Sequence, residues 1–182
     1  RPVHLVYLPA AGLTRLHATP AHQADGSWRV DLSVRFLAAG PEQSLALRLV
    51  GPDGATLSTS ETRLPASTEP QSLAPLTISA AQVQLWSPAS PTLYGVEIVA
   101  RGPGGESRVW QRFGLRTFEF VDHGPFKLNG ERLLLRGTHR HEDHAGLAAA
   151  MTDELMETEM RLMKRMGANF IRLGHYQQSR RI

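Results

Sequence analysis

The sequence has no cysteine among its 182 residues. Disulfide bonds and thiolate metal ligands are therefore excluded, and the cysteine content leaves the cellular compartment open. No apolar run is long enough to cross a bilayer, and the N-terminus carries no signal-peptide pattern. We therefore expect no membrane partner. Because the first residues read as a strand, a signal peptide could lie outside this sequence, and both a cytoplasmic and a periplasmic localisation fit it.

Lysine is also scarce, and nearly all of the positive charge comes from arginine. The net charge is +3, with 20 Lys and Arg against 17 Asp and Glu, and Lys127 and Lys164 are the only lysines. The arginines are spread along the chain and are offset by acids such as Asp31 and Glu97. A nucleic-acid-binding protein is expected to show a clustered basic face with aromatic residues between the charges. We therefore predict no nucleic-acid partner.

Alternating apolar and polar residues dominate the first two thirds of the chain. Residues 28–36 alternate throughout, which is typical of a half-buried strand. Short strands with no helical period predict an antiparallel β-sandwich of the immunoglobulin type over residues 11–117. The Ser/Thr/Pro-rich residues 65–75 are expected to form a loop or an edge. Further alternating segments lie at residues 45–49, 94–98 and 109–113, and Gly/Pro turns lie at residues 51–54 and 102–105.

A different pattern follows residue 117. Asn129-Gly130 predicts a tight hairpin, and the apolar residues 133–135 predict a parallel strand buried on both faces. Thr152 can cap a helix that has acids in its first turn, bases in its last turn and Gly167 as its stop. Residues 170–173 are the next expected strand, so the order strand, helix, strand predicts a parallel sheet or barrel. The packing face of the helix is expected to carry Leu155, Leu162 and Met166, with methionines beside them.

Polar side chains cluster beside both expected strands, at residues 133–144 (LLLRGTHRHEDH) and 172–176 (RLGHY). Such clusters at strand ends are where binding and catalytic sites usually lie. One hypothesis for the first cluster is a zinc-dependent hydrolase, because imidazole and carboxylate at this spacing can hold zinc. The H-x-H-x-D-H pattern of the metallo-β-lactamase superfamily is matched by His139, His141, Asp143 and His144. That superfamily needs further ligands downstream, and only His175 remains here.

A longer series of motifs points to a different family. In chain order the motifs are Leu85-Trp-Ser-Pro88, Pro91-Thr-Leu-Tyr94, Phe113-Gly-Leu-Arg116, Phe126-Lys-Leu-Asn-Gly130, Leu135-Arg-Gly137, Arg140-His-Glu142, Leu162-Met-Lys164, Gly167-Ala-Asn169 and Arg172-x-x-His175-Tyr176. Together they resemble glycoside hydrolase family 2, the family of β-galactosidases and β-glucuronidases. The resemblance implies three parts. Residues 1–10 would be the closing strand of a preceding jelly-roll sugar-binding domain or a linker, residues 11–117 the sandwich, and residues 118–182 the first portion of a (β/α)₈, or TIM, barrel.

The resemblance also implies a role for the two polar clusters. By matching position, His141, Arg172 and His175 are expected to line the subsite of the sugar that is cleaved, with Tyr176 and Glu142 as further substrate-binding residues. Arginine and imidazole side chains can donate hydrogen bonds to the sugar hydroxyl groups, and these bonds tighten in an oxocarbenium-like transition state. Glu142, or Arg140 before it, could instead anchor the loop through an ion pair. The implied activity is that of a retaining β-glycosidase, with β-galactoside as the first substrate and β-glucuronide as the second.

The resemblance further implies what this chain lacks. A retaining glycosidase needs two carboxyl groups, and the family takes both from later barrel strands, beyond Ile182. We therefore expect no catalytic residue here and no activity from the chain alone. No cofactor or metal is expected in this segment, although a longer protein could hold a divalent cation. An incomplete barrel leaves apolar surface and sheet edges open, which favours a homo-oligomer.

Three departures from the family pattern leave the sugar preference open. His139 stands where many members have asparagine, and Ala145 and Gln177 stand where proline is usual. A non-catalytic sandwich that serves as a spacer or binding module is a further alternative for the isolated chain.

Overall fold

The computed structural model describes residues 5–179 and 181–182. The chain divides into two compact units, an N-terminal unit of Val6–Thr117 and a C-terminal unit that contains Phe118–Ile182. The strand expected near the N-terminus is not found in its described part. Residues 1–4 lie outside the described residues, and residues 5–8 have no regular secondary structure. Leu5 is 84% and Tyr7 90% exposed, so their apolar side chains pack against no partner strand in the described chain.

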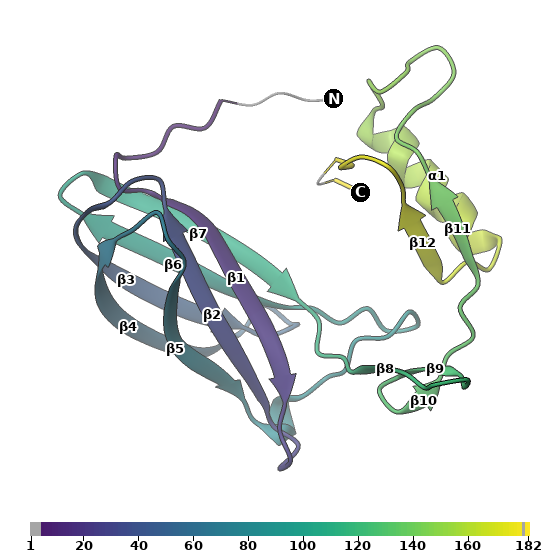
Figure 1. Cartoon of the computed structure of the whole chain (residues 1–182), viewed down its shortest axis with the longest axis horizontal. Helices are drawn as coiled ribbons and strands as arrows, with labels where there is room; N and C mark the ends of the chain where they lie inside the picture. The colour runs from purple at the N-terminus through teal and green to yellow at the C-terminus, as the bar shows by residue number, and fades with distance from the viewer. Residues whose placement is uncertain (1–4, 180) are drawn as a thin grey trace. The chain divides into compact units, whose positions relative to one another are not determined.

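The N-terminal unit contains two antiparallel sheets (Figure 1). One sheet has the order β1-β2-β5, and the other has the order β4-β3-β6-β7. A single turn of 3-10 helix, Ala80–Gln82, precedes β6. The architecture is the antiparallel sandwich that the alternating segments predict. The strands are β1 (Leu13–His22), β2 (Trp28–Phe36), β3 (Gly40–Val50), β4 (Thr56–Ala66), β5 (Gln71–Ile78), β6 (Tyr94–Gly102) and β7 (Gly105–Phe113).

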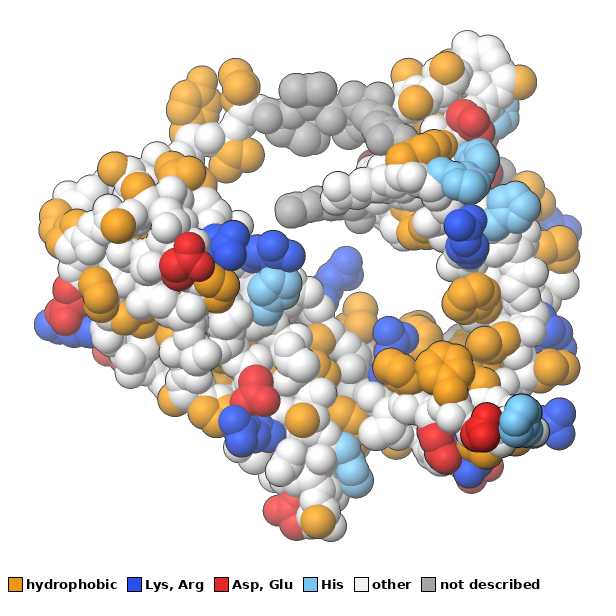
Figure 2. All heavy atoms as spheres, viewed as in Figure 1, with side chains coloured by type: hydrophobic (Ala, Val, Ile, Leu, Met, Phe, Trp, Pro, Cys, Tyr) orange, Lys and Arg blue, Asp and Glu red, His pale blue; other side chains and the backbone are white. Residues whose placement is uncertain are grey.

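The core lies between the inward faces of the two sheets. Every second residue of β2 is buried, from Trp28 to Phe36, while the residues between them carry polar and charged side chains outward (Figure 2). This follows from the period-two geometry of a strand. Tyr94 is 1% exposed and stacks on Phe113, and burial raises the pKa of its phenol. Its hydroxyl donates to the Gln82 carbonyl at 2.6 Å, so the only polar atom of this side chain is satisfied.

The Ser/Thr/Pro-rich stretch is divided between two edge strands. β4 ends at Ala66 and β5 begins at Gln71, and each lies at the edge of its sheet. Proline is tolerated at edges because an edge strand does not need every backbone N–H for pairing. The expectation of a loop or an edge is therefore correct, with the loop confined to residues 67–70.

The sandwich ends in a segment that the Leu-Trp-Ser-Pro motif holds in place. Trp86 N–H donates to the Leu115 carbonyl at 2.8 Å, and the guanidinium of Arg116 lies 4.5 Å from the centre of the Trp86 ring. Gly114 lies against this ring, because a Cβ there would be 3.0 Å from Trp86 Cγ and Cδ1. The motif therefore fixes the residues that lead out of the sandwich.

The C-terminal unit begins with a small antiparallel sheet of order β10-β9-β8. Its strands are β8 (Phe118–Phe120), β9 (Phe126–Leu128) and β10 (Glu131–Arg132). The turn between β9 and β10 is the predicted Asn129-Gly130 pair, with φ of 53° and 82°. Positive φ at both central residues defines the type I′ turn that suits the twist of a two-residue hairpin. The hairpin prediction is confirmed.

A strand–helix–strand unit follows, as predicted. β11 (Gly137–Arg140) and β12 (Phe170–Leu173) pair in parallel, and α1 (Asp153–Arg165) connects them (Figure 1). The position predicted for the first strand is wrong, because residues 133–135 form no strand. The Asn169 side chain binds this segment instead. Its amide nitrogen donates to the Leu134 carbonyl at 3.0 Å, and its oxygen accepts from Arg136 N–H at 2.8 Å.

Helix α1 has the predicted ends but a different packing face. Thr152 accepts a hydrogen bond from Leu155 N–H at 3.3 Å, so it caps the helix as expected. Met156 is buried, whereas Leu162 is 54% and Met166 69% exposed, so the face predicted from Leu162 and Met166 is wrong. Met156 is the buried residue of this helix. In the part of the chain that the structure describes, no helix is long and apolar enough to cross a membrane.

Candidate functional site

Side chains at the end of β11 alternate between buried and exposed positions. Arg140 is 4% exposed and Glu142 is 2% exposed, whereas His141 between them is exposed. Successive side chains of an extended segment point to opposite faces. The backbone therefore places the imidazole of His141 at the surface and both charged neighbours inside the unit.

The residues after β12 bring further polar groups to the same imidazole. The ring of His175 lies 5.0 Å from that of His141 at an angle of 85°, and the Tyr176 ring lies 6.0 Å away. His139 is also near, with its ring 5.9 Å from His141. The Tyr176 hydroxyl accepts a hydrogen bond from Glu142 N–H at 2.8 Å, which ties the two segments together.

Arg172 joins this group across Gly174. A Cβ at Gly174 would lie 2.5 Å from Arg172 Nη1 and 3.9 Å from His141 Cδ2. A side chain at position 174 would therefore displace the guanidinium from its place beside the imidazole. The structure thus gathers four of the five predicted substrate-binding side chains, those of His141, Arg172, His175 and Tyr176, on one exposed surface.

Glu142, the fifth predicted residue, points the other way. Its buried carboxylate accepts a hydrogen bond from Ser179 N–H. The side chain therefore holds the segment after Tyr176 and is not presented with the exposed imidazoles. One expectation from the sequence is that Glu142 could anchor the loop through an ion pair. Glu142 does hold this loop, but its partner is a backbone N–H and not a cation.

Arg140 is the centre of a buried network. Its Nε and Nη2 both lie 2.8 Å from the same carboxylate oxygen of Glu159 on α1. Nη1 donates to the Gln178 side-chain oxygen, and Gln178 Nε2 donates back to the Arg140 carbonyl at 3.0 Å. The guanidinium also contacts Met151 Sδ at 3.3 Å. Arg140 thus connects β11, the helix and the segment that carries His175.

Sequence reasoning missed the partners in this network. Glu159 looks like one of several acids on α1, and Gln178 and Ser179 follow the last family motif without a pattern of their own. Gly174 indicates close approach of other groups to the backbone, but these groups are Arg172 and His141 of the exposed cluster and not the partners of Arg140.

The side chains of the zinc hypothesis do not form a metal site. Among the residues that the structure describes, which include His139, His141, Asp143 and His144, no three His, Cys, Asp or Glu side chains converge on one point. The His144 ring nitrogen Nδ1 lies 2.9 Å from the Ala145 carbonyl oxygen. The spacing of the hexad is therefore matched in sequence but not in space, and the zinc hypothesis is not supported.

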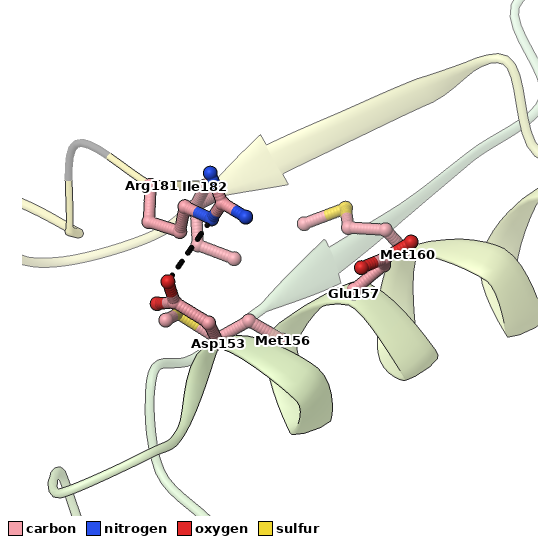
Figure 3. A pocket seen from close by; sticks show the side chains of 6 residues that line it. All are labelled: Asp153, Met156, Glu157, Met160, Arg181 and Ile182. Carbon is pink, nitrogen blue, oxygen red and sulfur yellow. Dashed lines mark ion pairs between the residues drawn. The ribbon is translucent and has the colours of Figure 1, made fainter.

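A cavity beside α1 is lined by residues outside this cluster. A cavity of about 220 Å³ is lined by Asp153, Met156, Glu157, Met160, Arg181 and Ile182 (Figure 3). An ion pair of 3.3 Å joins Arg181 to Asp153 at its edge. None of the predicted sugar-binding residues lines it, and its two methionines give it an apolar wall.

The exposed cluster is suited to binding polar hydroxyl-rich molecules. Imidazole and phenol groups can both donate and accept hydrogen bonds, and a guanidinium offers five donors in a fixed fork. None of the four side chains of this cluster is a carboxylate, so the cluster supplies contacts and orientation and no carboxylic acid/base pair.

Comparison with known proteins extends over both units. Residues 11–116 match the family model described as glycosyl hydrolases family 2, and residues 120–182 match that of the TIM barrel domain of the same family. A protein of Formosa agariphila provisionally named a beta-glucuronidase is 51% identical over 96 residues, which is 52% of this chain and 12% of that protein. A beta-galactosidase of Photobacterium profundum is 39% identical over 103 residues, covering 55% of this chain and 10% of that protein.

Solved structures agree with these matches. The beta-glucuronidase of Parabacteroides merdae superimposes with a TM-score of 0.88 at 39% identity, over 97% of this chain and 22% of that one. Beta-glucuronidase 3 of Bacteroides uniformis superimposes with a TM-score of 0.82 at 43% identity, with the same coverage. The predicted fold, a sandwich followed by the first part of a barrel, is confirmed.

Proposed function

Because the chain belongs to glycosyl hydrolase family 2, we propose that it is a segment of a retaining β-glycosidase that hydrolyses the O-glycosidic bonds of β-glycosides. The family resemblance drawn from the motifs is confirmed by these matches. The chain spans 22% of the length of the Parabacteroides enzyme and 12% of the Formosa protein. The activity is therefore proposed for a longer protein that contains this segment.

The observation that carries the proposal is the exposed group of His141, Arg172, His175 and Tyr176. Two segments 31 or more residues apart in sequence (141 to 172) contribute to one surface whose rings lie 5.0–6.0 Å apart. We propose that these side chains donate hydrogen bonds to the hydroxyl groups of the sugar that is cleaved. Such bonds strengthen as the ring flattens toward an oxocarbenium-like state, which lowers the barrier.

The acid/base and nucleophile are proposed to come from other parts of the longer protein. A retaining mechanism needs two carboxyl groups roughly 5–5.5 Å apart. Glu142 is buried and bound to Ser179 N–H, so it is proposed to act as a positioning residue. On this proposal the 182-residue chain alone has no glycosidase activity.

A β-glucuronide is favoured over a β-galactoside as the substrate, which reverses the order expected from the sequence. Two relatives that cover 97% of the chain are β-glucuronidases. The guanidinium of Arg172 also gives the group a positive charge, which suits a sugar that carries a carboxylate. Association of copies through the C-terminal unit stays a prediction, and the exposed side chains of Leu134, Phe170 and Leu173 favour it.

The test uses the longer protein with p-nitrophenyl β-glucuronide and β-galactoside. We expect His141→Asn to lower kcat/KM by about 10²-fold, in the range typical of lost transition-state hydrogen bonds. His123→Asn is the matched control, because His123 lies in a turn outside the cluster at φ 52°, a conformation that asparagine tolerates. Equal effects of the two substitutions would refute the role of the cluster. Turnover by the 182-residue chain alone would refute the placement of the carboxyl groups.

A further inference from the structure

Two arginines face each other on the outer surface of the sandwich. Arg15 on β1 and Arg35 on β2 are direct partners in the antiparallel register, and the next outward pair is His17 and Ser33. Like charges directly opposite each other on neighbouring strands are destabilising. Figure 2 shows Lys/Arg side chains gathered over this sheet, with a histidine and an Asp/Glu side chain beside them. The pairing therefore needs a compensating negative group.

The described residues do not supply that group. Neither Arg15 nor Arg35 forms an ion pair with another residue in the described ranges, and the same is true of the nearby acid Glu69. Two residues away from Ser33 on the same strand face, Asp31 is already engaged by Arg29 at 2.7 Å. Arg15 and Arg35 are thus left without an ion-pair partner in the described ranges, whereas Arg29 and Asp31 on the same sheet face pair with each other.

Arg35 also has an unsatisfied donor. Its Nε is buried and has no hydrogen-bond partner among the described residues. Buried donors in folded proteins nearly always have a partner, and an unsatisfied one commonly marks the place of a water or an ion. An oxyanion suits this donor better than water does, because the arginine opposite contributes a second positive charge.

A small cavity lies at this point. Its volume is about 30 Å³, and it is lined by Arg15, His17, Ser33, Val34, Arg35 and Pro70. Pockets that enclose a whole small-molecule ligand are roughly ten times larger or more. The cavity therefore suits a single oxyanion group, with the remainder of its ligand outside. The donors around it are two guanidinium groups, an imidazole and a hydroxyl.

We propose that this cavity is an anion-binding site that takes one oxyanion group, a carboxylate, sulfate or phosphate, between Arg15 and Arg35. The site lies in the sandwich and does not depend on the proposed glycosidase activity. Guanidinium groups bind planar and tetrahedral oxyanions through paired N–H donors, so all three groups fit the same chemistry. The free ligand supplies the negative partner that neither arginine has in the ion pairs of the described residues.

The site is tested by titrating the 182-residue chain with sodium sulfate, sodium phosphate and sodium glucuronate at constant ionic strength. The readout is the NMR signal of the arginine Nε–H groups, because burial slows solvent exchange of the Arg35 group. We expect a saturable shift of the Arg35 signal with at least one probe, with a Kd on the order of 1 mM. The probe that binds most tightly identifies the oxyanion source.

Arg35→Gln, in which binding is read from the Nε–H signal of Arg15 on the other side of the cavity, should weaken binding by about tenfold or more, since it removes both the charge and the fork. Arg29→Gln is the matched control, because Arg29 lies on the same face of the same strand but is already paired with Asp31. Its effect should stay within about twofold.

Three results would overturn the proposal. The first is an NMR shift that rises linearly with probe concentration or is matched by chloride. The second is an equal loss of affinity in the two variants. The third is binding by the 182-residue chain but not by the longer protein. The last result would mean that a carboxylate from elsewhere in the longer protein fills the site.

Discussion

Replacing Glu159 by glutamine would remove the only carboxylate that contacts the buried guanidinium of Arg140 in the described chain. The Arg140 side chain is 2% exposed and that of Glu159 is 22% exposed. Glutamine keeps an oxygen acceptor at the same place, so the substitution isolates the charge. The arginine would then be a buried cation with a neutral amide, Gln178, as its other hydrogen-bond partner.

The expected loss follows from the burial of this pair. Removing one partner of a fully buried ion pair costs about 3–5 kcal/mol. The partial exposure of Glu159 and the retained acceptor reduce this to about 2 kcal/mol. The equivalent substitution of Glu157, whose carboxylate forms an exposed pair with Arg161 on the same helix, should cost only about 0.3–0.5 kcal/mol. The two substitutions lie on the same helix and make the same change in chemistry and net charge. The difference between their losses of stability therefore measures the effect of burial.

Hydrogen exchange measured by mass spectrometry is the suitable assay. Trp28, Trp86 and Trp110 all lie in the N-terminal unit, so tryptophan fluorescence reports the sandwich and not this network. A loss of about 2 kcal/mol should speed exchange of residues 170–179 by about 30-fold. In Glu157→Gln the increase should be about twofold. Residues 94–102 of β6 serve as the internal reference.

Equal exchange of residues 170–179 in the two variants would refute this reasoning. That result would mean that Arg140 does not hold the segment of His175 through α1. The network would then be a packing contact without influence on the exposed imidazoles.

Two further predictions concern the sandwich. Burial would raise the pKa of Glu97, but the hydrogen bond from Arg48 and the charge of a second arginine outweigh it and lower the pKa below 4.5. The ionised Glu97 therefore stabilises the fold above that pH, and this stabilisation is lost on acidification. The Tm measured by tryptophan fluorescence should fall more steeply between about pH 6 and pH 3 in the wild type than in Glu97→Gln. Parallel curves of Tm against pH would contradict this. Gly95→Ala should destabilise the sandwich by about 1–3 kcal/mol, because the new Cβ would lie 2.1 Å from Trp110 Cη2. Gly104→Ala, with its nearest atom at 3.8 Å, is the control in urea unfolding, and an equal loss there would contradict the steric explanation.

The strands that could be predicted are those with one buried face. The bounds expected for Trp28–Phe36 are those observed, because every second side chain enters the core and the sequence must alternate. The strand β1 was not predicted. It is an edge strand with polar residues and a proline in its sequence, LTRLHATPAH, and only two of its residues are buried. Its pairing with β2 is decided by backbone hydrogen bonds that leave little pattern in the side chains.

The wrong placement of β11 has a specific cause. Residues 133–135 are the most apolar of the region, yet Leu134 is 66% exposed. The strand forms at Gly137–Arg140, where Gly137 permits close approach to Phe170, since a Cβ there would be 2.7 Å from the Phe170 ring. Contacts with a residue far along the chain decided the register, and local hydrophobicity could not show them.

The exposed side chains of the candidate site could be predicted from the sequence, but the buried residues that hold them in place could not. The motif positions of His141, Arg172 and His175 led to one surface. The carboxylate of Glu142 was expected at that surface, but strand alternation turns it inward to Ser179. Strand bounds at this point decide which side chains face out, so the error in placing β11 also hid the alternation.

The parallel pairing of β11 and β12 has a consequence for the order of folding. The hairpin of β9 and β10 closes over the two residues Asn129 and Gly130, and such local turns form in about 1–10 μs. Arg136 and Asn169 are 33 residues apart, so the parallel pair can form only after the crossover through α1 has closed, which is slow. The imidazoles of His141 and His175 therefore come together late in folding, and β11 has no partner strand until β12 pairs with it. During synthesis at about 5–20 residues per second, that interval lasts at least as long as the ribosome needs to reach β12.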